Sequence, residues 1–429
     1  MRIVISTFGS FGDLHPYVAI ALELKRRGHR PVIATSEAYR EKTDAVGLEL
    51  HPVRPVLPSW EDTDAVSRMV TDFMDERKGT ERILRFLSGS LRDSYEDLLA
   101  ATSGADLLFT HPLPLANPVV AAKTGLPWVS SVLSPISLFS AYDPPVPPQM
   151  PSLYRLLKLH PAFVRALVPI GNLQLRPITE PVHRLRASLG LPRGGNPVFD
   201  AQHSPALVLA LFSRVLASPQ PDWPRNTHVT GFAFYDRRDR SGDAREADPA
   251  LLRFLDAGPP PVVFTLGSSA IWAAGDFYAE SIRAARALGL RALLLIGDER
   301  NRPPGTLPEG VAAFDYAPYS ELLPRAAAVV HHGGVGTTGQ ALAAGVPSLI
   351  VPFSHDQFDN AARVERRGAG RTLPRKRYNA AAAERELRPL VNDPAYAARA
   401  ADIGRLVRSE DGTQTACDLI ESLFEGRGR

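Results

Sequence analysis

The chain has 429 residues, enough for two domains that each bury a core, and its 44% hydrophobic and 22% charged residues are ordinary for a globular protein. The formal net charge is only +3, lysine is scarce and the arginines are scattered, which argues against a nucleic-acid-binding protein. The single cysteine, Cys417, has no partner for an internal disulfide and lies far from the motifs described below, so we expect neither a disulfide framework nor a catalytic thiol.

The N-terminus reads as a strand over residues 2–5 rather than as a charged leader segment. No apolar run along the chain reaches membrane-spanning length. We therefore expect a cytoplasmic protein, and a peripheral contact with the inner face of a membrane stays open.

The first half of the chain alternates strands with helical sequence. A buried strand at 2–7 leads into a glycine turn at 8–16 and then into a helix at 17–27, whose apolar residues recur at helical spacing. Polar, helical sequence fills residues 60–103. Further strands are expected at 31–35, 105–109, 128–133, 206–212 and 228–232.

A proline-rich stretch at 134–151 carries Phe139 and Tyr142. It predicts a long loop, and such a loop in a compact domain is more often a binding lid than idle chain. The stretch at 153–168 mixes apolar residues with arginines and a lysine. It is either a helix packed over the pocket, which is favoured, or a surface that contacts a membrane or a lipid acceptor.

A polar, charged segment between residues 235 and 249 predicts an interdomain linker. Beyond it, strands are expected at 261–266, 292–296, 311–314, 325–330 and 346–351, and helices at 277–288, 339–344 and within 380–424.

Each half therefore contains the order strand, glycine turn, helix, strand, which two doubly wound Rossmann-type α/β domains explain most simply. We expect domains at 1–235 and 250–405, a linker at 236–249, and a C-terminal helical segment at 406–429 that crosses back to the first domain.

The most informative stretch is His-His-Gly-Gly-Val-Gly-Thr-Thr-Gly-Gln at residues 331–340. Its glycines let the backbone approach a ligand closely, and the start of the following helix offers unpaired N–H groups and the positive end of a dipole. The histidines and threonines add side-chain donors. The stretch predicts a diphosphate site, although similar turns are common in α/β proteins without such a ligand.

Several motifs together resemble the donor-binding signature of the family 1 nucleotide-sugar glycosyltransferases. They are Tyr-Ala-Pro-Tyr at 316–319, the stretch at 331–338, Ala-Leu-Ala-Ala-Gly-Val-Pro at 341–347 and His-Asp-Gln-Phe-Asp-Asn at 355–360. The turn Gly-Ser-Phe-Gly-Asp-Leu-His-Pro at 9–16 resembles that of the bacterial and sterol branches. Phe-Thr-Leu-Gly-Ser-Ser at 264–269 and Pro-Gln-Pro-Asp-Trp-Pro at 219–224 look most like the bacterial rhamnosyltransferases of rhamnolipid synthesis.

This resemblance covers nearly the whole chain and implies the GT-B fold, with two facing Rossmann-like domains that bind the acceptor and the donor. It implies an inverting transfer of a hexose or deoxyhexose, such as glucose or rhamnose, from a UDP- or TDP-sugar. The acceptor would be a hydroxyl of a lipophilic small molecule such as a lipid, sterol, flavonoid or polyketide. The resemblance implies no metal and no cofactor besides the sugar nucleotide, and it leaves a monomer or a weak homodimer open.

The resemblance also carries roles onto donor-binding residues. Tyr316 would stack on the nucleobase, and Ala317 would read it through its backbone. His332 would donate to the diphosphate, where negative charge grows on the leaving group in the transition state. Further contacts to the phosphates are implied for Ser268, Gly334, Gly336 and Thr337.

On the sugar side, Asp356 and Gln357 match the pair that bonds sugar hydroxyls. Gln340 stands where many relatives have a glutamate that grips the ribose hydroxyl pair. An amide can still bond one hydroxyl, but the loss of the charged acceptor leaves the choice between a uridine and a thymidine donor open. His331 should point away from the ligand if strand alternation persists, and is expected to be structural.

Catalysis requires that the acceptor hydroxyl lose a proton as it attacks the anomeric carbon. Plant relatives use a histidine at the first turn and an aspartate after a later strand, whereas this chain has Asp13 at the turn and His111 at the later position. We predict a reversed dyad in which Asp13 is the general base and His111 orients or shares the proton. Burial or a neighbour would have to raise the pKa of Asp13 above about 3.9. His15 is the rival base.

Phe11, together with Phe139 and Tyr142, is expected to contact the acceptor. The carboxylate pair Asp62 and Asp64 has the spacing of a metal site, but no strand precedes it, so we interpret it as helix capping and solvated surface. Two rival functions remain, a nucleotide-sugar epimerase and a catalytically silent helper of a partner transferase. The helper should have lost the base, the phosphate histidine or the Asp-Gln pair, and all three are present.

Overall fold

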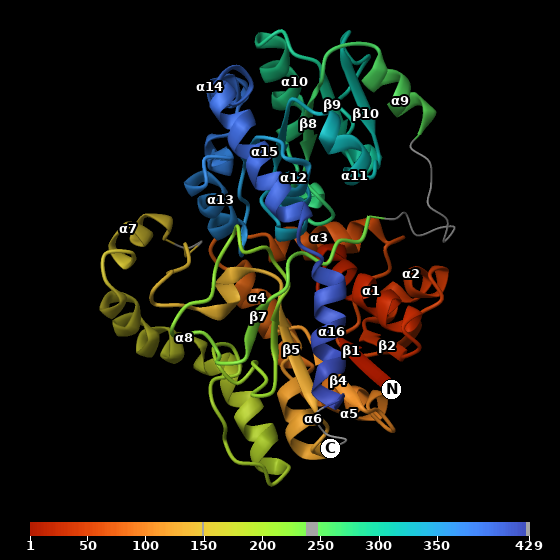
Figure 1. The fold of residues 1–429 in the computed structure, drawn as a ribbon, viewed down its shortest axis with the longest axis vertical. Coiled ribbons are helices and arrows are strands. Elements are labelled where there is room, and N and C mark those ends of the chain that lie inside the picture. Colours follow the sequence, from red (N-terminus) through yellow and green to blue (C-terminus); the bar gives the residue numbers. More distant parts are fainter. Residues whose placement is uncertain (148–149, 237–247, 426–429) are drawn as a thin grey trace. The chain divides into compact units, whose positions relative to one another are not determined.

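The computed structural model describes residues 1–147, 150–236 and 248–425 (Figure 1). The chain divides into two compact units. The first comprises Met1–Val66, Lys78–Tyr235 and Asp411–Arg429, and the second comprises Ser67–Arg77 and Asp236–Glu410. The segment 67–77 thus packs with the second unit although it lies in the N-terminal half of the sequence.

A wholly parallel seven-stranded sheet forms the centre of the first unit, in the order β3-β2-β1-β4-β5-β6-β7. The strands are β1 (Arg2–Ser6), β2 (Arg30–Thr35), β3 (Glu49–Pro52), β4 (Leu107–Thr110), β5 (Trp128–Val132), β6 (Val208–Ala210) and β7 (Thr227–Val229). The central strands are buried along almost their whole length, because helices cover both faces of a parallel sheet. The strand order reverses between β1 and β4, and doubly wound sheets bind ligands at such a switch point.

The helices of the first unit are α1 (Phe11–Arg26), α2 (Arg40–Ala45), α4 (Gly79–Gly89), α5 (Leu91–Ala101), α6 (Asn117–Thr124), α7 (Tyr154–Leu157), α8 (Pro161–Ser188) and α16 (Gly412–Glu425), while α3 (Thr63–Phe73) continues into the segment 67–77. The prediction of one helix at 153–168 was wrong. His160 accepts a hydrogen bond from the Ala162 backbone N–H at 3.1 Å, and with Pro161 it starts a separate and much longer helix.

Helix α1 begins at Phe11, six residues before the predicted start at residue 17. Ser10 and Asp13 form a reciprocal capping box, in which Ser10 Oγ accepts from the Gly12 N–H and Asp13 Oδ2 accepts from the Ser10 N–H. The expected glycine turn is therefore largely the first turn of a helix. Asp62 also caps a helix, because its Oδ1 accepts from the Ala65 N–H at 3.0 Å at the start of α3. The capping interpretation of that carboxylate is therefore confirmed.

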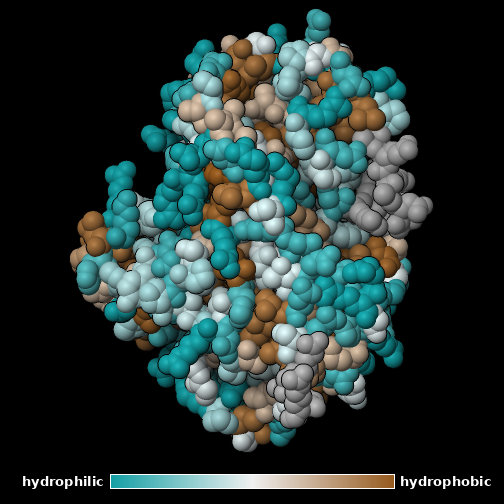
Figure 2. All heavy atoms as spheres, viewed as in Figure 1, coloured by the Kyte–Doolittle hydropathy of each residue, from teal (hydrophilic) through white to brown (hydrophobic). Residues whose placement is uncertain are grey.

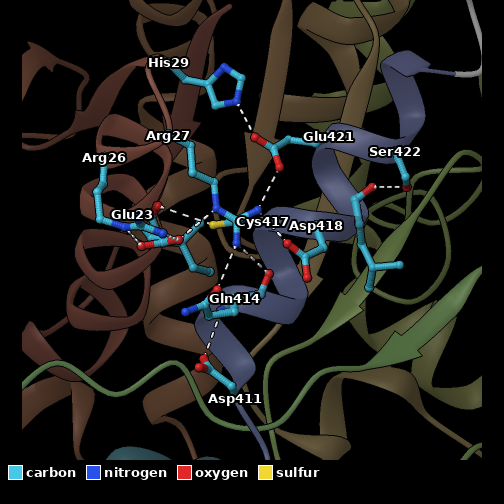
Figure 3. Close-up of polar contacts among 12 residues, drawn as sticks. Glu23, Arg26, Arg27, His29, Asp411, Gln414, Cys417, Asp418, Glu421 and Ser422 are labelled. Carbon is cyan, nitrogen blue, oxygen red and sulfur yellow. Dashed lines mark hydrogen bonds and ion pairs between the residues drawn. The ribbon is translucent and has the colours of Figure 1, made fainter.

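The C-terminal helix α16 packs on α1 within the first unit, as the predicted crossover requires (Figure 3). Arg27 at the end of α1 pairs with Asp418 at 2.5 Å and with Glu421 at 2.7 Å, and Glu421 also contacts His29 Nε2 at 2.7 Å. Cys417 is fully buried beneath these ion pairs, and burial raises the pKa of its thiol to about 12. Such a thiol is unreactive, as the sequence led us to expect.

A parallel six-stranded sheet forms the centre of the second unit, in the order β10-β9-β8-β11-β12-β13. Its strands are β8 (Val262–Thr265), β9 (Ala292–Leu295), β10 (Val311–Phe314), β11 (Ala328–His331), β12 (Ser348–Ile350) and β13 (Gly370–Thr372). The helices are α9 (Pro249–Asp256), α10 (Phe277–Ala287), α11 (Tyr319–Leu322), α12 (Val335–Ala344), α13 (Gln357–Arg366), α14 (Ala380–Asn392) and α15 (Pro394–Arg408). The switch point lies between β8 and β11. Two Rossmann-like α/β units confirm the predicted fold class.

Two boundaries in the second unit differ from the sequence-based expectation. Most of the predicted linker, residues 237–247, lies outside the described residues, but α9 already begins at its end because Asp248 Oδ1 accepts from the Ala250 N–H at 2.8 Å. The helix expected at 339 begins at Val335, with Gly334 as its N-cap. The glycines of the diphosphate motif therefore lie in the first turn of α12, where backbone N–H groups are unpaired.

Candidate active site

Asp13 and His111 lie at the switch point of the first sheet, one after β1 and the other directly after β4. Asp13 Oδ1 lies 3.8 Å from His111 Nε2. The neighbouring strands β1 and β4 run parallel, so their carboxyl ends bring the two residues together although 98 positions separate them in the sequence. The structure thus places the two members of the predicted dyad next to each other.

The carboxylate of Asp13 has one occupied and one available oxygen. Oδ2 accepts from the Ser10 backbone N–H at 2.7 Å and from Ser10 Oγ at 3.0 Å, while Oδ1 faces His111. Burial raises the pKa of Asp13, and the two hydrogen bonds from Ser10 act in the opposite direction. The rise makes the carboxylate a better proton acceptor than a solvated aspartate. A side chain at Gly9 would collide with it, since a Cβ there would lie 2.3 Å from Oδ2.

His111 is buried, and burial lowers its pKa to about 3, so the imidazole is neutral at physiological pH. The Leu113 backbone N–H donates to His111 Nδ1 at 3.4 Å, which assigns the ring proton to Nε2. Asn117 Nδ2 donates to the His111 backbone carbonyl at 3.1 Å and holds the segment in place. His111 therefore presents an N–H toward Asp13 Oδ1, at a separation longer than that of a hydrogen bond.

His15 lies in an aromatic cluster rather than beside His111. Its ring packs 5.9 Å from Phe11 and 5.2 Å from Tyr235, measured between ring centroids. Burial, together with the positive charge of Lys42, lowers the pKa of His15 well below its usual value. A base needs contact with the acceptor hydroxyl, and the buried Nε2 of His15 has no hydrogen-bond partner, so His15 stays the rival base.

The Phe11 ring stacks on Trp60 with the ring centroids 4.7 Å apart, and it meets Tyr39 edge-on with the centroids 5.4 Å apart. Lys42 Nζ lies 4.4 Å from the centroid of the Phe11 ring. This cluster adjoins the Asp13 turn, because Phe11 is the first residue of α1. Sequence reasoning singled out Phe11 but missed Trp60 and Tyr39. A tryptophan in an otherwise polar stretch is a signal that could have pointed to them.

The other two predicted acceptor residues lie on the proline-rich loop, of which residues 148–149 are outside the described part. Phe139 and Tyr142 are 42% and 48% exposed, although Phe139 packs edge-on against Phe199 and Arg165 lies over the Tyr142 ring. Asp222 holds the loop between them, accepting from Ser140 Oγ at 2.6 Å and from the Ala141 N–H at 2.7 Å. This anchoring role of Asp222 was not predicted.

His332 lies at the switch point of the second sheet. It follows β11 and is buried, and burial lowers its pKa to about 4, so the ring is neutral. Its ring lies against two glycines, because a Cβ at Gly334 would be 2.4 Å from Nε2 and one at Gly267 would be 2.6 Å from Cε1. Its Nδ1 is buried and has no hydrogen-bond partner. Buried polar atoms are normally paired, which is consistent with a ligand-binding position.

His331, in contrast, is fully buried at the end of β11 and accepts from the Gly333 N–H at 3.1 Å. The alternation of side chains along the strand sends it to the opposite face from His332. Ser268 follows Gly267 at the neighbouring turn after β8, where Thr265 Oγ1 and Tyr319 OH are 2.8 Å apart.

Thr337 and Gly336 lie in the first turn of α12, where the backbone N–H groups are unpaired and the helix dipole is positive, which favours an anion. Thr337 is largely buried, and its hydroxyl contacts that of Tyr319. A Cβ at Gly336 would meet nothing within 4 Å. The packing of the protein itself therefore does not require a glycine there, and the position leaves room for a ligand to approach the helix.

We expect Gly336→Ala to raise thermal stability, since alanine favours a helix over glycine by roughly 1 kcal/mol, while it weakens nucleoside diphosphate binding about tenfold or more. Melting temperature and calorimetric Kd measure the two effects. The matched control is Gly89→Ala at the end of α4, where a Cβ also meets nothing within 4 Å. Gly89→Ala should change stability alone. If Gly336→Ala binds the nucleoside diphosphate as tightly as the wild type, Gly336 does not belong to the binding site.

Gln357 begins α13, and its carbonyl oxygen is already engaged. Oε1 accepts from the backbone N–H groups of Phe353 at 2.8 Å and Ser354 at 3.2 Å, which leaves the amide NH₂ as a donor. Asp356 Oδ2 accepts from Asn360 Nδ2 at 2.8 Å, and the same amide donates to the Gly333 carbonyl at 2.9 Å. Asn360 thus ties α13 to the turn at Gly333, a role that the sequence did not single out.

The base-side residues lie on the segment after β10. Tyr316 is partly exposed, whereas Ala317 is buried in the core of the unit, so its side chain is not available to a ligand. Gln340 lies on α12 and is partly exposed. These placements are compatible with the predicted roles.

Across the described residues, we find no group of three or more histidine, cysteine, aspartate or glutamate side chains that could hold a metal ion. In the same part of the chain, no helix combines the length and the apolar character needed to cross a bilayer.

Comparison with known proteins identifies the family to which this chain belongs. Residues 3–97 match the model of the glycosyltransferase family 28 N-terminal domain, and residues 288–418 match that of the erythromycin biosynthesis protein CIII-like C-terminal domain. The chain is 33% identical over 435 residues to O-mycaminosyltylonolide 6-deoxyallosyltransferase of Streptomyces fradiae, covering 100% of this chain and 98% of that protein. The chain belongs to the family 1 glycosyltransferases. It is therefore a nucleotide-sugar-dependent enzyme of the GT-B fold, as the motifs indicated.

Two other glycosyltransferases are less similar to this chain in sequence, and one of them is much longer. This glycosyltransferase is 28% identical to the sterol 3-beta-glucosyltransferase of Yarrowia lipolytica, of which it spans only 28%. The solved structure of glycosyltransferase VinC in complex with DTDP superposes with a TM-score of 0.68 at 21% identity, covering 99% of this chain and 100% of that one. That likeness supports the fold.

Proposed function

We propose that this glycosyltransferase transfers a 6-deoxyhexose such as rhamnose from a TDP-sugar to a hydroxyl of a lipophilic natural product, with inversion. The observation that carries the proposal is the pairing of Asp13 Oδ1 with His111 at the first switch point. A carboxylate with a raised pKa, lying beside a neutral imidazole, suits the role of general base for an alcohol.

In the proposed reaction, each switch point contributes its own groups. The acceptor oxygen attacks the anomeric carbon from the face opposite the diphosphate, its proton passes to Asp13 Oδ1, and the bond to the diphosphate breaks. The leaving group takes up the electron pair, and His332 with the N–H groups at the start of α12 stabilises the growing charge. The donor-side roles of Ser268, Gly334, Gly336, Thr337, Asp356 and Gln357 are part of the same proposal.

The preference for thymidine rests on Gln340, and the choice of a 6-deoxyhexose rests on the relative that is 33% identical, which is a 6-deoxyallosyltransferase. A neutral amide offers no charged acceptor to a ribose hydroxyl pair, so a deoxyribose loses little at this position. We propose Tyr316 as the base-stacking ring, and Phe11, Phe139 and Tyr142 as acceptor contacts. We also propose that the enzyme is cytoplasmic, a monomer or weak homodimer, and in peripheral contact with the inner face of a membrane.

A donor panel tests this function. TDP-rhamnose, TDP-glucose, UDP-glucose and UDP-GlcNAc are each offered with a macrolide aglycone, a flavonoid, a sterol and a hydroxyalkanoyl lipid, and product is measured by mass spectrometry. We expect TDP-sugars to give product at least as fast as UDP-sugars, because the amide of Gln340 offers no charged acceptor to the 2′-hydroxyl that only the uridine donor carries. A preference for UDP-glucose with a sterol acceptor would contradict the proposal.

A further inference from the structure

Helix α7 and the first half of α8 expose a run of apolar side chains, which we call the α7–α8 surface. Its large apolar residues, each 37–69% exposed, are Met150, Leu156, Leu159, Phe163, Leu167, Val168, Ile170 and Leu173. Among residues 161–177, all of them described, none is buried. Contiguous apolar exposure of this kind marks an interaction surface rather than ordinary solvent-facing sequence.

The first half of α8 is amphipathic in spite of its exposure. Phe163, Leu167, Ile170 and Leu173 follow one another at intervals of four, three and three residues, which places them along one side of the helix. On the face shown in Figure 2, hydrophobic atoms gather at the left edge, where Figure 1 places α7 and α8. The stripe gives α8 an apolar side that the first unit does not cover.

The charged residues in the stretch of sequence that carries this stripe are all basic. Between Pro144 and Thr179 the sequence contains three arginines and one lysine and no aspartate or glutamate, which leaves four positive charges. Arg155, Lys158 and Arg165 are exposed, and within the described residues none of the three pairs with a carboxylate. Arg165 instead donates to Tyr142 OH at 3.1 Å. The surface is therefore both apolar and cationic.

We propose that the α7–α8 surface docks on an anionic lipid bilayer. A helix with an apolar stripe and a cationic polar face lies in the plane of a membrane interface, where apolar side chains enter the acyl boundary and cations meet anionic headgroups. A second copy of this chain fits less well, because an isologous contact would place like charges against one another. This inference rests on the proposed function and specifies which surface makes the proposed membrane contact. Lipophilic acceptors accumulate in a bilayer, so docking there would bring the enzyme close to them.

The test is flotation of the full-length protein with vesicles of equal parts phosphatidylglycerol and phosphatidylcholine, compared with vesicles of phosphatidylcholine alone. We expect binding to the anionic vesicles that weakens as salt rises. The double variant Leu159→Glu/Leu173→Glu should bind about tenfold more weakly or worse, because both side chains are more than two-thirds exposed and would otherwise enter the acyl boundary. The variant Arg155→Glu/Lys158→Glu should lose most of the preference for phosphatidylglycerol.

The matched control is Leu406→Glu on α15, a leucine of comparable exposure at 59%, which should bind vesicles as the wild type does. Unchanged melting temperatures show that the variants fold. The assay contains no sugar nucleotide, so its outcome is independent of the proposed transfer. The proposal is overturned if the wild type ignores anionic vesicles, if Leu159→Glu/Leu173→Glu binds them equally, or if those substitutions instead dissolve a dimer or a complex with an acidic protein.

Discussion

Asp13→Asn is expected to lower kcat by about 10²–10⁴-fold with every acceptor, the range that loss of a general base usually produces. The asparagine amide oxygen can still accept the hydrogen bonds that Ser10 donates, so the cap of α1 is kept. Donor binding should also stay intact, because no donor contact is assigned to this turn. Steady-state kinetics with a saturating TDP-sugar measure the effect.

A matched control for this variant is Asp93→Asn, which changes another acidic residue in the first turn of a helix of the same unit. Asp93 is half exposed and pairs with Arg54 at 3.1 Å, away from the switch point. Its substitution should leave kcat unchanged. Wild-type turnover in Asp13→Asn would move the role of base to another residue, and His15→Ala would then be the next variant to measure.

His332→Ala is expected to lower kcat by about 10²–10³-fold with all donors, the usual loss when one charge-stabilising donor is removed. The loss of kcat should exceed the loss of affinity for the nucleoside diphosphate, since charge on the leaving group is greatest as the bond breaks. Single-turnover rates and calorimetric Kd values separate the two effects.

His332→Asn tests the same assignment by rescue, because its amide can donate a hydrogen bond without a charge. We expect its kcat to lie between those of the wild type and His332→Ala. Equal rates for the alanine and asparagine variants, with normal melting temperatures, would mean that His332 acts by packing on Gly267 and Gly334 rather than by donating to phosphate.

The sequence predicted the features that depend on local pattern. Buried apolar runs identified β1, β4, β8 and β11, because parallel strands covered on both faces are apolar along their whole length. The repeated order of strand, glycine turn, helix and strand then placed Asp13 and His332 at carboxyl ends of strands, where both lie.

Other features depend on contacts that no local pattern announces. The early start of α1 required recognising that Ser10 and Asp13 cap each other, and glycines nearby suggested a turn instead. The aromatic neighbours of Phe11 come from separate segments, so Trp60 could not be grouped with it before the fold was known. The apolar sequence after residue 153 resembled a buried helix, and only the fold shows that its side chains stay exposed.

The dependence of kcat/KM on pH in the wild type, Ser10→Ala and Asp13→Asn tests the role of Asp13 most directly. Protonated Asp13 cannot accept a proton, so the wild-type rate should fall as pH drops through its raised pKa, above the ordinary 3.8. Ser10→Ala removes a hydrogen bond that lowers this pKa, so the acid limb should move to higher pH. The limb should vanish from the residual activity of Asp13→Asn. The same acid limb in all three proteins would contradict the assignment of Asp13 as the base.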